Sequence, residues 1–174
     1  MQGVTDEAGG PATTPLVEEA VKKAAVAWVA VGDGPARALW CLPVDGTLYV
    51  VSGPGEQSAP GLAEATTAAV TLRGDHGGQI VTWPAAVTRI APGSDEWATV
   101  APQVATKRLN APGGAADLVA RWADECALNR LTPAGEPLAA GPTLPDDSLA
   151  APPRPTPAAR QVRKPFRLHR VRRR

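Results

Sequence analysis

Glycine and proline interrupt this chain so often that long regular elements have little room to form. Nineteen prolines and seventeen glycines make up about a fifth of the 174 residues. Because proline lacks a backbone donor and glycine weakens helices and strands alike, this density argues against an all-helical bundle. The stretches between the interruptions are rich in valine, alanine and tryptophan and predict strands. We expect strands over residues 24–31, 36–44, 47–52, 68–73 and 79–90, and a last one over 127–131.

Two details of the predicted strands carry structural information. Asp45-Gly46 lies between two apolar runs and predicts a tight hairpin turn. Pro84 lies inside the longest predicted strand, where it requires a bulge or an edge position because it cannot donate to a ladder.

Helical periodicity is confined to short stretches. Residues 16–23 predict an amphipathic helix behind Thr14-Pro15. Ser94, followed by two acidic residues, predicts the capped start of a second helix, which Pro102 should kink or split. Residues 115–126 predict a third helix, and residues 58–67 a short helix or a loop.

This order of elements predicts a mainly β fold with peripheral helices (β+α), in which five to six antiparallel strands close into a small barrel. Closure removes the exposed edges that an open meander would leave. We expect the barrel domain to occupy residues 16–133, behind a disordered leader over residues 1–15. Prolines crowd residues 134–157, which predict an extended linker, and residues 158–174 form a basic tail.

The net charge of +1 conceals a strong asymmetry. Nine of the 18 basic residues follow position 147, where there are no acids, so residues 1–147 carry a net charge of −8. Such a tail is either a solvated segment or a binding element for nucleic acid or another polyanion. The residues that would bind a polyanion are Arg163, Lys164, Arg167, Arg170, Arg172, Arg173 and Arg174.

Several classes of protein are disfavoured. The longest apolar run, residues 24–31, is too short to span a membrane, and no secretory signal is visible, so we expect a cytoplasmic protein. Cys41 and Cys126 do not form a disulfide framework, and no metal-ligand spacing, P-loop or nucleophile elbow is present. His76, in a glycine-rich turn, is most simply a solvated loop residue.

The pattern resembles the FMN-binding split barrel of the pyridoxamine 5′-phosphate oxidase superfamily, in an uncharacterised branch from high-GC bacteria. Residues 37–42, which begin with Arg37 and run towards Asp45-Gly46, are similar to the family's second strand. Residues 47–52 resemble its third strand, and Gln79-Ile80-Val81-Thr82 resembles its fifth. The resemblance covers about residues 17–133. It departs from the family where Leu42 and Glu56 stand in place of cations that hold the flavin phosphate.

The resemblance implies a cofactor, FMN in the first place, with a deazaflavin or haem as alternatives that some relatives use. Arg37 would bind a phosphate, Ser52 and Gln79 would face the flavin, and Trp40 could stack on a planar ligand. Their simpler roles are a rim arginine, a turn hydroxyl, a residue at the start of a strand and a core tryptophan. A homodimer with two sites at its interface is also implied.

Two functions therefore remain open. The first is an FMN-binding split-barrel protein, which could act as a small flavin-dependent oxidoreductase. The alternative is a non-catalytic dimeric scaffold with a degenerate flavin site, whose arginine-rich tail binds nucleic acid or another polyanion.

Overall fold

The computed structural model describes residues 14–111 and 113–145. The basic tail and nearly all of the predicted leader lie outside the described residues, so the expectations for them stay predictions. The first part of the predicted linker is described, and it includes a short strand and a single helical turn.

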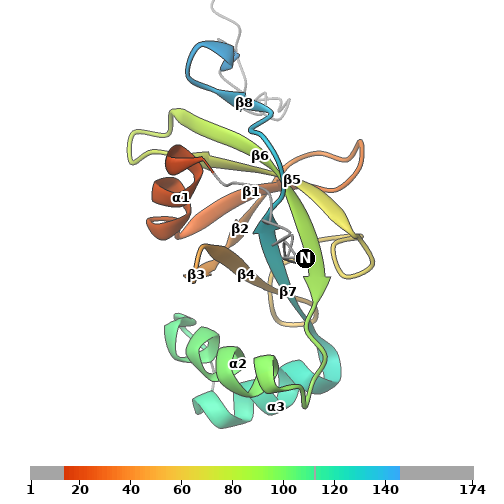
Figure 1. Cartoon of the computed structure of the whole chain (residues 1–174). Coiled ribbons are helices and arrows are strands. Elements are labelled where there is room, and N and C mark those ends of the chain that lie inside the picture. The colour runs from red at the N-terminus through yellow and green to blue at the C-terminus, as the bar shows by residue number, and fades with distance from the viewer. Residues whose placement is uncertain (1–13, 112, 146–174) are drawn as a thin grey trace, which may run out of the picture.

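One antiparallel sheet dominates the structure (Figure 1). Its strand order is β2-β1-β5-β6-β7-β4-β3. The short strand β8 is not part of this order and pairs with β6. The strands are β1 (Val26–Ala30), β2 (Arg37–Trp40), β3 (Leu42–Val44), β4 (Thr47–Ser52), β5 (Thr67–Arg73), β6 (Gln79–Arg89), β7 (Ala127–Pro133) and β8 (Ala139–Ala140).

The sheet closes into a split barrel because its two outermost strands are neighbours in the chain. β2 pairs with β1 at one end of the strand order, and β3 pairs with β4 at the other. Only Cys41 separates β2 from β3, and its backbone N–H donates to the carbonyl of Ala25 at 3.0 Å. The predicted barrel is thus confirmed. It has eight strands, more than the five to six expected, since the predicted strand over residues 36–44 divides at Cys41 and β8 is added.

Local turn chemistry explains two features of the strands. Asp45 and Gly46 have φ angles of 47° and 77°, which form the two-residue turn between β3 and β4 that the sequence predicts. Pro84 has its carbonyl, and hence its nitrogen, on the side of β7 and β8, where Ala134 N–H donates to that carbonyl at 2.8 Å. Because β7 ends at Pro133 and β8 begins at Ala139, the nitrogen faces a gap in the ladder.

Three α-helices lie around the barrel, α1 (Pro15–Lys22), α2 (Asp95–Lys107) and α3 (Ala115–Glu125), followed by the 3-10 turn η1 (Gly141–Thr143). Ser94 caps α2 by accepting a hydrogen bond from Trp97 N–H at 3.1 Å. α2 runs through Pro102 as a single helix, so of the two outcomes expected there, a kink or a split, the split is wrong. Residues 58–66 form a loop, one of the two conformations expected there.

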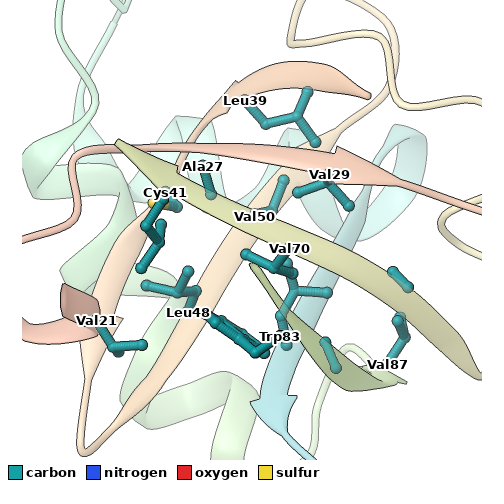
Figure 2. Packing of buried hydrophobic residues seen from close by; sticks show 14 of the residues in the cluster. Val21, Ala27, Val29, Leu39, Cys41, Leu48, Val50, Val70, Trp83 and Val87 are labelled. Atoms are coloured by element: carbon teal, nitrogen blue, oxygen red, sulfur yellow. The ribbon is translucent and has the colours of Figure 1, made fainter. Parts of the chain in front are cut away.

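Side chains pack into two apolar clusters. The first fills the barrel around Trp83, as Figure 2 shows, and includes Val21 of α1 and Leu62 of the loop before β5. The second lies between the outer face of β4 and β7 and the helices α2 and α3, with Trp122 fully buried. Across the described residues, no helix is long and apolar enough to cross a membrane.

Candidate functional site

The side chains best suited to bind a ligand lie at one end of the barrel. Strand pairing brings the ends of β4 and β6 and the starts of β2, β5 and β7 to this end. The loop over residues 53–66 crosses it and buries Leu62 in the barrel core (Figure 1). We call this region the loop end of the barrel.

A cleft of about 460 Å³ opens at the loop end, beside the loop. Ser52 of β4, Arg89 of β6 and Ala127 of β7 line it. Its charged lining residues among those described are Arg89, Glu64, Asp124 and Glu125, so acids outnumber cations by three to one. The volume lies in the range of small-molecule sites, but the local charge disfavours an anionic ligand.

Asn129 lies in the barrel interior next to residues that line this cleft, opposite Arg89 of β6, and is not itself part of the lining. It follows Ala127 by two residues along β7, pairs with Val50, and therefore shares the interior face with the residues that line the cleft. The side chain is fully buried, and neither its Nδ2 nor its Oδ1 has a hydrogen-bond partner among the described residues. A buried amide without partners is costly, so this donor and acceptor pair is the chemical feature of the loop end that most needs an explanation.

The structure brings two of the four predicted cofactor residues to the loop end. Ser52 is buried and lines the cleft. Arg37 is exposed and lines a smaller hollow of about 150 Å³. Ala59 and Pro60 line both spaces, so the two residues lie on either side of the same loop.

The other two predicted residues lie elsewhere. Gln79 begins β6 at the opposite end of the barrel, where its Nε2 donates to Thr82 Oγ1 at 2.9 Å. Trp40 packs against the outer cluster and lines a third hollow with Gln57 and Arg108. Within one chain, these four residues therefore do not form a single site.

Glu56, which replaces an expected cation, forms the centre of an ionic cluster. Its side chain is 3% exposed. Its Oε1 lies 2.5 Å from Arg121 Nη2 and accepts from Trp122 Nε1 at 3.1 Å, while its Oε2 accepts from Arg108 Nε at 2.8 Å. Burial alone would raise the pKa of Glu56, but the hydrogen bonds from these three donors lower it below the ordinary value of 4.5. The loop thus supplies one carboxylate to two arginines, Arg108 after α2 and Arg121 in α3.

The loop that carries Glu56 is held by further contacts. Gln57 Nε2 donates to the carbonyls of Trp40 and Val51 at 2.9 and 3.1 Å, and Gln57 Oε1 accepts from Trp40 N–H. Gly53 has a φ of 142°, and a Cβ there would lie 2.9 Å from Cys126 Cα. Only glycine fits this close approach, so the loop has one well-defined path.

Other candidates from the sequence play simpler roles. Burial raises the pKa of Cys41 to about 12, which is unsuitable for a nucleophile at neutral pH. His76 is exposed in the β5–β6 turn. Arg73 stacks on the Trp28 ring at 4.6 Å, beside a groove of about 520 Å³ that faces α1 at the end opposite the cleft. No metal-binding group of histidine, cysteine and acidic residues occurs in residues 14–111 and 113–145.

Sequence reasoning missed Asn129 and the partners of Glu56. Asn129 stands inside the predicted strand over residues 127–131, but the sequence does not show which face of the sheet it occupies. Arg108 and Arg121 are 52 and 65 positions from Glu56, and nothing in the sequence pairs them.

No family model matches the chain, and no curated protein matches it. Similar solved structures include HutZ, described as the haem storage protein of Vibrio cholerae, at 12% identity and a TM-score of 0.49, covering 71% of this chain and 92% of that one. A "Putative Pyridoxamine 5'-phosphate oxidase" from Listeria innocua has 16% identity and a TM-score of 0.45, over 66% and 88% of the two chains. An FAD-binding protein from Mesorhizobium loti has 15% identity and a TM-score of 0.43, over 70% and 90%.

The likeness is one of fold. Identities of 16% or less and TM-scores below 0.5 transfer no ligand and no residue role to this chain. The split barrel is established by the strand pairing of the chain itself, through the continuity of β2 and β3.

Proposed function

We propose that this protein binds a flavin-class planar ligand in the cleft at the loop end of its barrel. The observation that carries the proposal is the buried amide of Asn129, whose donor and acceptor are both without partners among the described residues. The cyclic imide edge of a flavin presents adjacent N–H and C=O groups, which complement an amide. Ser52 at the rim of the cleft offers a hydroxyl to the same ligand.

The fit differs between the ring and the phosphate of FMN. The polar pair of Asn129 and the cleft volume suit a planar heterocycle. The phosphate dianion fits poorly, since Glu64, Asp124 and Glu125 oppose it, and the nearby arginines are already paired with Glu56. A deazaflavin ring has the same imide edge and fits equally well, whereas the haem macrocycle lacks that edge and needs axial ligands. A bound flavin would supply hydride and electron chemistry.

We expect this protein to bind riboflavin more tightly than FMN. Riboflavin has the same ring but lacks the dianionic phosphate that the three acids would repel. Titrations followed by flavin fluorescence quenching should give a Kd for FMN that is at least about fivefold higher than the Kd for riboflavin at low salt. The ratio of the two Kd values should be smaller at high salt.

A matched variant tests the electrostatic cause. Asp124→Asn removes one acid from the cleft lining and should narrow the difference between the two ligands. Tighter binding of FMN than of riboflavin would contradict the charge argument. Freshly isolated protein that is colourless and quenches no flavin would contradict the proposed function as a whole.

The second candidate is the dimeric scaffold whose tail binds a polyanion, favoured by the charge division along the sequence. Replacing the seven tail cations Arg163, Lys164, Arg167, Arg170, Arg172, Arg173 and Arg174 with alanine should abolish binding to a random DNA or RNA duplex. The intact protein should bind with an affinity that falls steeply with salt, because each neutralised phosphate releases counterions. Fluorescence anisotropy at two salt concentrations measures both effects, and binding that survives the substitutions would rule out the tail as its source.

Both candidate functions assume a homodimer, which we propose as well. Size-exclusion chromatography with light scattering would determine the mass of the protein in solution. A monomer at all concentrations would remove the interface site that the sequence resemblance implies.

A further inference from the structure

The environment of Glu56 has the composition of an anion-binding site. Three N–H donors from two elements converge on one carboxylate: Arg108 Nε, Arg121 Nη2 and Trp122 Nε1. Two guanidinium groups and an indole N–H are donors that recognise oxyanions through charge-assisted hydrogen bonds. The carboxylate that they bind belongs to the loop after β4.

The donors are held by contacts that do not involve Glu56. Arg121 Nη1 donates to the carbonyl of Pro54 at 2.7 Å, and Arg108 Nη1 donates to the carbonyl of Leu109. Trp122 is fully buried in the cluster between α2, α3 and the sheet. Removal of the carboxylate would therefore leave the donor set largely in place.

We propose that Arg108, Arg121 and Trp122 form an oxyanion site that the chain fills with its own Glu56 carboxylate, and that this site takes inorganic phosphate once the carboxylate is removed. The ligand class is a tetrahedral oxyanion of the size of phosphate, which can accept from all three donors. The inference is independent of the proposed flavin cleft, which depends on Ser52 and Asn129 and is tested by flavin fluorescence.

In the intact protein, the Glu56 carboxylate outcompetes a free anion because it is tethered. Its loop is fixed by the Gln57 side chain, by the N–H of Gly53 donating to Gln57 O at 3.1 Å and by the N–H of Glu56 donating to Gly53 O at 3.0 Å. A tethered group has a high effective concentration at its site, so phosphate should have no measurable effect on the wild-type protein.

The test compares thermal unfolding in phosphate and in chloride at equal ionic strength. Glu56→Ala opens space at the donors, and millimolar phosphate should raise its unfolding midpoint by about 4 °C relative to chloride, with no comparable rise in the wild type. Adding Arg121→Ala to this variant should abolish the response. Glu96→Ala is a matched control, since it frees Arg130 from an ion pair that is about one third exposed and should gain no response to phosphate.

A second variant keeps the test valid if Glu56→Ala does not fold. Glu56→Ser also clears the site and leaves a small hydroxyl there, and phosphorus-31 line broadening measures phosphate binding to this variant directly. The proposal holds if either variant binds phosphate and Arg121→Ala removes the binding. It is overturned if neither variant binds, or if binding persists without Arg121.

Discussion

Replacing Glu56 with glutamine should lower the free energy of unfolding by about 3 kcal/mol at pH 7. The side chain is 3% exposed and has two guanidinium groups as partners, so its loss leaves positive charges facing each other beneath the loop. The arginine side chains are 29% exposed, so water can stabilise them in part. The expected loss of stability is therefore at the lower end of the range for breaking a buried ion pair. Urea unfolding followed by tryptophan fluorescence measures the change.

The same residue should make stability depend on acid pH. The pKa of Glu56 is lower in the folded chain than its ordinary value of 4.5, so its contribution is complete above that value and is lost as the pH falls through the folded pKa. The wild type should thus lose stability below about pH 4.5 more steeply than Glu56→Gln. Glu96→Gln is the control: its ion pair with Arg130 is about one third exposed and should contribute under about 1 kcal/mol. Equal acid slopes in wild type and Glu56→Gln would contradict the assignment.

The barrel was predictable because its determinants are local. β4 has the bounds expected from its apolar run, and the turn at Asp45-Gly46 needs only two residues that tolerate positive φ. Pro84 was expected at a bulge or an edge position. It pairs with Ala69 in the register of β5 and β6, and on the other side of β6 the gap between β7 and β8 leaves its nitrogen without a ladder partner. The division of one strand at Cys41 was not predictable, since it depends on which strands lie on each side of that residue.

The candidate site was less predictable because it depends on distant contacts. Ser52 and Arg37 reach the same barrel end through strand order, whereas Gln79 lies at the opposite end. The role of Glu56 depends on helices more than 50 positions away, and from the sequence alone it looked like a missing cation. Asn129 is informative only once β7 is known to direct it into the barrel, since on the opposite face it would contact the helices.

Replacing Asn129 with valine should stabilise the protein and abolish ligand binding. Valine is close in size, suits a strand, and removes a donor and an acceptor that have no partner among the described residues. The free energy of unfolding should rise by about 1–3 kcal/mol, the cost of burying an unpaired polar group. The Kd for riboflavin should increase at least about tenfold, because the imide edge would then meet a methyl group.

A variant that gains stability but loses riboflavin affinity distinguishes an amide that binds the ligand from an amide with a purely structural role. Thr71→Val is the matched control, because the Thr71 hydroxyl is satisfied by Thr82 at 2.7 Å and its loss should not stabilise the chain. If Asn129→Val destabilises the protein, the amide has an internal partner such as a buried water, and its cost no longer calls for a ligand. If the variant is stabilised but binds riboflavin as the wild type does, the ligand lies above the amide without contacting it. The proposed site stands only when the gain in stability and the loss of binding occur together, since a buried polar group that lowers stability is expected where function requires it.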